Sequence, residues 1–311
     1  MELSWLLMQK ILSMALMVML GFVATKKKVL KEEDTTPLSA ICLYLVCPCM
    51  LISAFQMEFS VDKVWNLLLV TAAAIVVHIF YIVLTSIVGK KLNLKPVQKA
   101  SLVYSNAGNL IIPIVSSVLS AESVFYACAF IVIQNCLFWT HGIIVMGDKS
   151  QVNLKKIIMN PNIIAIVIGL GLFFARVTLP MPIADALSSV GGMIGPMSML
   201  IVGMIMASAD LKAVFSDKRA YLVCAGRLLI YPFLVILLFW ISHVTVLLPQ
   251  TKELYLVTFL AAAAPSASTV VQAAKLYHKD AAGASVINVM SVVLCIITMP
   301  VMIYLYQLFL Y

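Results

Sequence analysis

Ten apolar runs follow one another along the whole chain and are joined by short connectors. A membrane-spanning helix needs roughly 20 apolar residues, which is about the length of each run. Of the 311 residues, 63% are hydrophobic and only 11% are charged, so little sequence is left for a separate soluble domain. The pattern predicts an all-α polytopic membrane protein with ten transmembrane helices. The expected spans are residues 5–25, 36–57, 64–89, 97–119, 122–146, 161–178, 183–208, 219–242, 253–275 and 281–308.

The basic residues alternate from one connector to the next. Most lysines and arginines lie in connectors 26–34, 90–99, 148–156, 210–219 and 275–280, and the intervening connectors hold almost none. Because basic connectors stay on the cytoplasmic side, both termini are expected on the opposite side. The net charge of +8 is explained by these clusters. It does not indicate a nucleic-acid partner, because no basic stripe is interleaved with aromatic residues.

The longest basic connector follows the fifth predicted span and divides the chain into two blocks. We assign residues 1–147 to a first five-helix repeat, residues 148–160 to a cytoplasmic linker and residues 161–311 to a second repeat. Because five is an odd number, the second block starts from the opposite side of the membrane. Two similar blocks would then be inverted repeats, an architecture known among secondary transporters.

Helix-breaking residues recur at matching positions of the two blocks. The fourth span contains SNAGNLIIP (105–113) and the ninth contains AAAAPSAST (261–269), each near its middle. The second and seventh spans carry Pro48 and Pro196 near their middles. A single interrupted span would be read as a simple proline kink, whereas two at matching positions favour a pair of broken helices.

The fourth span is a poor continuous helix. Gly108 is a poor helix former, and the side chains of Asn106 and Asn109 compete with the helix for backbone hydrogen bonds. Pro113 lacks an amide donor and is tolerated in the first turns of a new helix. We therefore expect the chain to unwind near residues 106–109 and to resume as a half-helix that contains Pro113.

A half-helix that starts at mid-membrane presents free amides and the positive end of its dipole. Two such ends facing each other suit an anion, and a carboxylate in particular, without a buried cation. The sequence thus places a small organic anion between half-helices that start near Asn109–Pro113 and at Pro265. Ser266 and Ser268 are positioned to cap amides or to contact the ligand.

Other polar residues lie within the predicted spans. Asn135 and His141 in the fifth span are candidates for substrate binding or for interhelical hydrogen bonds. His78, half-way along the third span, is either a proton site or a neutral packing histidine. No Asp or Glu falls at mid-membrane, so coupling to H⁺ or Na⁺ is left open beside uniport driven by the membrane potential. Arg227 is expected to snorkel or to pair.

Signatures of enzymes are missing from the sequence. It has no HExxH, GxSxG or Walker motif. The four histidines lack ligand spacing, and the seven cysteines lie inside apolar runs. We expect no enzyme activity, no metal site and no cofactor.

Several segments resemble the auxin efflux carrier family, which includes the plant PIN carriers and compact bacterial permeases for malate or malonate. The segments are SNAGNLIIP (105–113), QNCLFWTHG (134–142), GPMSMLIVGM (195–204), and AAAAPSAST (261–269) with the following LYHKDAAGAS (276–285). The resemblance covers essentially the whole chain. It implies two inverted five-helix repeats, broken spans four and nine that cross, a transport domain that moves as an elevator, and a homodimer. It also implies that a carboxylate binds near the crossing, that Asn106 contacts it, and that Thr140 and His141 line the pocket.

The short connector between the halves departs from the long loop that plant carriers often have. It favours a bacterial permease of the inner membrane over an auxin-specific role. The predicted function is a secondary transporter that moves a mono- or dicarboxylate by alternating access. The alternatives are a sodium-coupled symporter of larger amphipathic anions, of the bile-acid type, and a membrane receptor that transports nothing.

Overall fold

The computed structural model describes residues 2–119, 121–146, 158–208, 214–243 and 251–310. The regular structure within these ranges is helical. The first half of the chain contains α1 (Glu2–Lys26), η1 (Glu32–Asp34), α2 (Thr35–Ile41), η2 (Cys42–Val46), α3 (Cys47–Ala54), α4 (Val61–Lys91), α5 (Pro96–Val103), η3 (Ala107–Ile111), α6 (Ile112–Val118), α7 (Ala121–Leu137), η4 (Phe138–Gly142) and α8 (Ile143–Val145). The second half contains α10 (Pro161–Phe174), α11 (Met181–Gly191), α12 (Ile194–Ser208), α14 (Lys218–Ala225), η6 (Gly226–Ile230), α15 (Tyr231–Ile241), α17 (Lys252–Ala263), α18 (Ser268–Leu276) and α19 (Ala281–Leu310).

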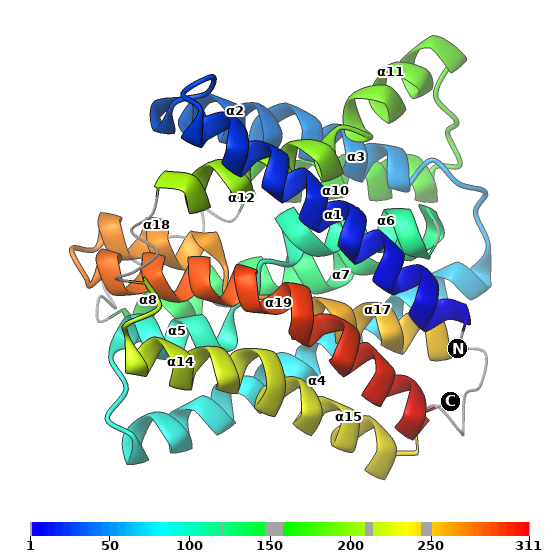
Figure 1. The fold of residues 1–311 in the computed structure, drawn as a ribbon. Helices are drawn as coiled ribbons and strands as arrows, with labels where there is room; N and C mark the ends of the chain where they lie inside the picture. The colour runs from blue at the N-terminus through cyan, green and yellow to red at the C-terminus, as the bar shows by residue number, and fades with distance from the viewer. Residues whose placement is uncertain (1, 120, 147–157, 209–213, 244–250, 311) are drawn as a thin grey trace.

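The helices form two groups that lie side by side (Figure 1). In the flanking group, α1 packs along α12, and α3 packs on α10 and α11. In the crossing group, α4 packs on α5 and α7, α17 packs on α7, and α14, α15 and α18 pack on α19. Contacts of α1 with α19 and of α12 with η3 join the two groups. The start of α1 and the end of α19 lie at the same end of the molecule (Figure 1).

The contact between α1 and α12 is close because glycines lie at the interface. A Cβ atom at Gly203 would overlap the backbone of Val18, and one at Gly21 would overlap the backbone of Leu200. Small residues let two helix backbones approach within a membrane, where van der Waals packing stabilises helix pairs. These two positions therefore fix α1 against α12.

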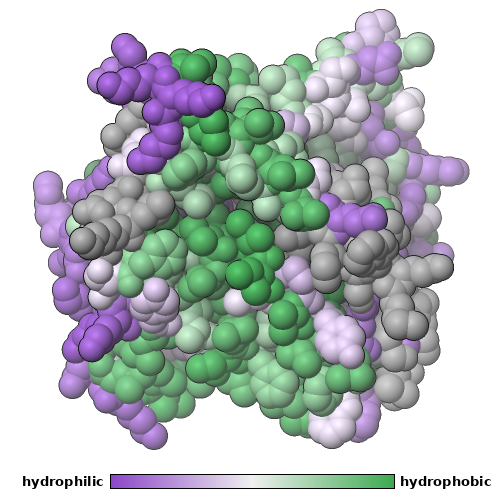
Figure 2. All heavy atoms as spheres, in the orientation of Figure 1, coloured by the Kyte–Doolittle hydropathy of each residue, from purple (hydrophilic) through white to green (hydrophobic). Residues whose placement is uncertain are grey.

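Apolar residues cover the middle of one face of the molecule. Figure 2 shows hydrophobic residues over the centre of one face, with hydrophilic residues gathered towards its two ends. Within the described residues, six helical segments are long and apolar enough to cross a membrane: Thr35–Ala54, Val61–Lys91, Glu122–Val145, Met181–Ser208, Lys218–Ile241 and Ala281–Leu310. The protein is therefore an integral membrane protein.

The other four expected spans are not among these six segments. The apolar stretch Leu12–Lys26 of α1 and the helix Pro161–Phe174 occupy the first and sixth. The fourth and ninth are each interrupted, into α5, η3 and α6 and into α17 and α18. Ten crossings and an inverted repeat stay predictions, because helix length and composition establish six spans within the described residues.

The second and seventh spans are interrupted less strongly than the fourth and ninth. Pro48 is the second residue of α3 and follows the π-helical turn η2, through which the helix continues. Pro196 lies in the first turn of α12, after a two-residue turn at 192–193 that separates α12 from α11. Pro196 thus occupies a first turn, where a missing amide donor costs least, whereas Pro48 lies inside a continuous helix just after a π-helical turn.

Candidate functional site

Two broken helices meet in the middle of the crossing group. In the fourth span the chain leaves the helical conformation at residues 104–106, between α5 and η3. In the ninth span it does so at residues 264–267, between α17 and α18. The first break lies nearer the N-terminus than residues 106–109, where the sequence indicates unwinding. Gly108 therefore belongs to η3, and Pro113 is the second residue of α6.

The two breaks are joined to each other by their backbones. Ser105 and Ser266 form an isolated antiparallel bridge. Its hydrogen bonds run from Asn106 N to Pro265 O (2.8 Å) and from Ala267 N to Tyr104 O (3.0 Å). Backbone groups within a membrane must be satisfied inside the protein. Each break thus supplies hydrogen-bond partners that the other lacks.

The first break is also held by a side chain of α7. Gln134 Oε1 accepts hydrogen bonds from Ser105 N (2.9 Å) and from Ser105 Oγ (2.7 Å). Gln134 Nε2 donates to Ser105 O (2.8 Å). One buried glutamine therefore satisfies the amide, the carbonyl and the hydroxyl of the central residue of the break.

The second break is held in the same way from α19. Asn288 Nδ2 donates to Ser266 O (2.7 Å), and Ser291 Oγ accepts from Ser266 N (3.1 Å). Ser291 Oγ in turn donates to Asn288 O (2.9 Å). In both blocks, the helix that follows the broken one therefore supplies the polar side chains that hold the break.

The expectation that Arg227 snorkels or forms an ion pair is wrong. Its side chain is fully buried and points at the crossing. It donates hydrogen bonds to the carbonyl oxygens of Ala264 (2.9 Å), Ala262 (2.8 Å), Leu102 (3.0 Å) and Val103 (3.4 Å). These carbonyls end α5 and α17, so one guanidinium caps both half-helices. The negative dipole ends of two helices take the place of a carboxylate partner.

A cavity of about 410 Å³ opens beside the crossing, between the two helix groups. The crossing group lines it with Asn106, Ser268, Thr269, Gln272 and Asn288, and the flanking group adds residues that include Thr35, Ser39, Cys42 and Ser198. None of the described residues that line it carries a charge. Hydroxyl and amide groups line its polar part, and they can donate hydrogen bonds to a ligand.

Two helical segments resume at this cavity. Asn106 is the N-cap of η3, and Ser268 is the first residue of α18. The side chains of the N-cap residues, Asn106 and Ala267, make no capping hydrogen bond to the amides of the first turns. First-turn amides have no partner within a helix, so a ligand in the cavity meets donors on this side of the crossing. Arg227 covers the opposite, carbonyl side.

The predicted binding residues are only partly brought together. Asn106 and Ser268 line the cavity. Pro265 and Ser266 are buried within the break, and Asn135 is half-buried on α7; none of the three is among the lining residues. The backbone of Asn109 belongs to η3, and its side chain lies outside the described parts.

The two candidate histidines also lie away from the cavity lining. The hydroxyl of Tyr104, at the start of the first break, is hydrogen-bonded to His141 Nδ1 (2.8 Å). His78 is buried on α4, where Nδ1 donates to Ala74 O (2.7 Å). Its Nε2 has no hydrogen-bond partner among the described residues. His141 thus contacts the first break through the hydroxyl of Tyr104. The hydrogen bond of His78 stays within its own helix, α4.

Sequence reasoning missed Arg227 and Gln134 as the residues that hold the crossing. Both are polar side chains inside apolar spans, and that signal marks them as candidates. The signal does not say which neighbour each one contacts. The neighbouring Asn135 carries the same signal, and no hydrogen bond links it to the break in the described structure.

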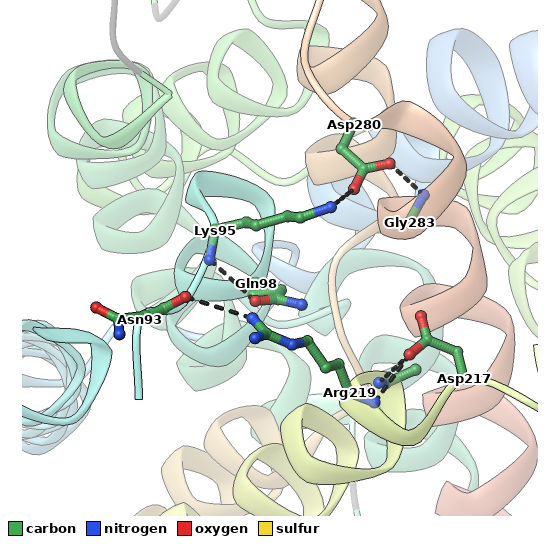
Figure 3. A network of polar contacts seen from close by, with 8 residues as sticks. Asn93, Lys95, Gln98, Asp217, Arg219, Asp280 and Gly283 are labelled. Atoms are coloured by element: carbon green, nitrogen blue, oxygen red, sulfur yellow. Dashed lines mark hydrogen bonds and ion pairs between the residues drawn. The ribbon is translucent and has the colours of Figure 1, made fainter. Parts of the chain in front are cut away.

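The connectors at one end of the crossing group form a polar network (Figure 3). Lys95 Nζ pairs with Asp280 Oδ2 (2.9 Å), which joins the connector before α5 to the connector before α19. The lysine, and the Gly283 amide that bonds Asp280 Oδ1, hold the pKa of this carboxyl below its usual value. Arg219, in the first turn of α14, donates to the carbonyl of Asn93 (3.4 Å) and so joins α14 to the connector before α5. The first and second halves of the chain are thereby tied at this end.

The family of the protein follows from a comparison of its sequence with family models. A family described as membrane transport protein matches residues 6–155 and 148–303. The chain belongs to this family. It is the auxin efflux carrier family that the sequence resembles, so the broken helices and the cavity are those of a membrane transporter. The comparison with curated proteins gives no significant match.

Proposed function

We propose that the protein is a secondary transporter for a small organic anion, a mono- or dicarboxylate, that binds in the cavity beside the crossing. The main observation behind this proposal is that a side chain caps one side of the crossing and no N-cap side chain caps the other. Arg227 covers the carbonyl ends of α5 and α17, while η3 and α18 start at the cavity without a side-chain cap from their N-cap residues. Each helix start carries about half a positive charge.

The lining of the cavity supports a carboxylate as the ligand. Asn106, Asn288 and Gln272 offer amide donors, and Ser268 and Thr269 offer hydroxyl donors. Hydrogen bonds to a charged acceptor contribute about 1.5–3 kcal/mol each, more than those between neutral groups. A volume of about 410 Å³ fits a small molecule.

A second cavity supports alternating access between the two groups. It has a volume of about 420 Å³ and is lined by residues that include Ser13 of α1, Ser53 of α3, Ser116 of α6 and Ser188 of α11. It thus lies near α6, while the first cavity lies at the start of η3. Both cavities lie where the flanking and crossing groups meet, so sliding of one group past the other would close one and open the other.

The proposal includes the wider architecture. Ten spans in two inverted five-helix blocks place the breaks at mid-membrane, and both termini lie on the non-cytoplasmic side of a bacterial inner membrane. The crossing group moves as an elevator against the flanking group, within a homodimer. A counterflow assay in liposomes decides whether transport is coupled to H⁺ or Na⁺.

Reconstitution into liposomes tests the transport of carboxylates. Counterflow of labelled malate, malonate, lactate and indole-3-acetate, and of a bile acid as the larger amphipathic anion, is measured with and without Na⁺ and at two pH values. Saturable movement of at least one carboxylate is expected, and movement of none refutes the proposal. A requirement for Na⁺ with larger amphipathic anions alone would favour the bile-acid type of symporter. Binding without translocation would favour a receptor.

A pair of variants tests the location of the site. Asn106→Ala removes one donor from the cavity, so binding should weaken by about tenfold to a hundredfold, as the loss of one hydrogen bond to a charged group predicts. The matched control is Asn135→Ala, because Asn135 is not among the residues that line the cavity. Equal affinities of the two variants would remove Asn106 from the site.

A further inference from the structure

Arg227 is the one charged side chain among the buried residues of the described structure. An arginine cannot be deprotonated in proteins, so its charge is permanent. No carboxylate forms an ion pair with it in the described parts of the chain. Its neighbours include the four helix-end carbonyls and the ring of Tyr81, whose centroid lies 5.5 Å from the guanidinium carbon.

The hydrogen bonds of Arg227 fix it to the crossing. It bonds the ends of both α5 and α17, and it comes from η6, the turn that links α14 to α15 in one helical segment. Tyr81 of α4 donates to Ala262 O (3.3 Å), one of the same carbonyls. Four spans therefore hold the guanidinium, and it can move only together with the crossing.

The charge of this assembly can be worked out from its parts. A helix dipole has equal and opposite ends, so the four half-helices add no net charge. The remaining charge is the +1 of Arg227. The Lys95–Asp280 pair lies in the connectors beside α5 and α19 and is neutral as a pair (Figure 3).

We infer that Arg227 balances the charge of the cargo: the substrate binds as a monoanion, and the loaded crossing group crosses the membrane without net charge. This inference rests on the proposed transport function and deepens it. The empty crossing group then carries +1 on its return. The return step depends on the membrane potential, and the loaded step does not.

The size of the effect follows from the cost of moving one charge. One charge that crosses the full potential changes its energy by about 2.3 kcal/mol per 100 mV, which is about a fiftyfold change in rate. A charge that crosses half of the field gives about sevenfold. Exchange of labelled for unlabelled substrate uses the loaded step alone. Net efflux also requires the return of the empty carrier.

The test compares exchange and net efflux of labelled lactate, which carries one negative charge, in the same proteoliposomes, with the potential clamped by a potassium gradient and valinomycin. The assay runs at pH 8, where an ordinary histidine with a pKa of about 6.5 is neutral, so that His78 and His141 add no charge. We expect exchange to change less than twofold between 0 and 100 mV and net efflux to change about sevenfold or more. Exchange that follows the potential, or net efflux that ignores it, would overturn the inference.

Variants of Arg227 separate its charge from its hydrogen bonds. Arg227→Gln leaves the loaded unit with −1, so exchange should become dependent on the potential. Arg227→Lys keeps the charge with fewer hydrogen bonds, so exchange should stay independent of it. Arg219→Gln, in the exposed first turn of α14, is the matched control and should behave like the native protein.

If Arg227→Gln fails to fold, the comparison of exchange with net efflux in the native protein still decides the matter. If no carboxylate moves under any condition, the proposed function itself fails. If a carboxylate moves but its exchange follows the potential, the proposed function stands and the charge balance at Arg227 is refuted. The two failures are therefore distinguishable.

Discussion

Replacing Gln134 by leucine should loosen the crossing. The side chain makes three hydrogen bonds, all to Ser105, and Ser105 is the residue that pairs with Ser266 across the two breaks. Leucine has a similar volume, so the substitution leaves little cavity. The expected loss is therefore that of the hydrogen bonds.

The magnitude has a lower and an upper bound. Interhelical hydrogen bonds in membranes contribute about 0.6 kcal/mol each on average, which gives about 2 kcal/mol for three. A buried polar group that loses its partner costs about 1–3 kcal/mol, so three groups raise the upper bound to several kcal/mol. We expect a loss of about 3 kcal/mol in the free energy of unfolding.

A graded series measures this loss by titration with SDS in mixed micelles. Ser105→Ala removes one of the three bonds and should cost about 1 kcal/mol. Asn135→Leu changes the next residue of α7, which is half-buried and does not bond the break, and should stay close to the native protein. A Gln134→Leu variant within about 0.5 kcal/mol of Asn135→Leu would refute the anchoring role of Gln134. Anion binding should weaken in parallel, because the cavity starts at the break.

Three further predictions concern topology, packing and pH. In a background without native cysteines, Ser39→Cys should react with an impermeant thiol reagent only from the cytoplasmic side and Ser188→Cys only from the other side, because the two residues line different cavities; the reverse result would invert the assigned orientation. Gly203→Val should abolish folding, measured as recovery of monodisperse protein, whereas Gly171→Val should be tolerated, since a Cβ there meets nothing within 4 Å. Asp280→Asn should lower stability at neutral pH by less than about 1 kcal/mol, because the pair with its lysine is exposed. The pKa of the Asp280 carboxyl is lowered in the folded protein. Its contribution to the free energy of unfolding is therefore present above the usual carboxyl range and is lost as the pH falls through the folded-state pKa. A larger loss of stability in the variant at pH 3 than at pH 7 would contradict this.

The sequence was informative wherever a residue acts on its own backbone. Proline and glycine restrict the helix that contains them, so interruptions in the fourth and ninth spans could be predicted from 105–113 and 261–269. The exact position of the first break was wrong by a few residues, because Gln134 and the second break decide which amides are satisfied. Those partners lie 29 or more residues away in the sequence.

The roles of polar side chains depend on tertiary packing and could not be predicted. Arg227 lies in the first half of its span, towards the end that the basic connectors predict to be cytoplasmic, and snorkelling is the usual outcome for an arginine at such a position. It turns inward because two helix ends meet there with unsatisfied carbonyls. Likewise Gln134 and Asn135 are neighbours of similar chemistry, and only the rotation of α7 decides which of them faces the break.

The bridge between the two breaks has a consequence for biosynthesis. Residues 265–267 emerge from the ribosome about 160 residues after Ser105, a delay on the order of 10 s at usual rates of synthesis. During that time Ser105 cannot have its final backbone partner. Gln134 follows within 29 residues, and Asn288 likewise follows Ser266 within 22. Each block of the chain thus supplies its own side-chain partners for the backbone groups of its break. The first half can therefore insert into the membrane before the second half is made, and the bridge forms afterwards.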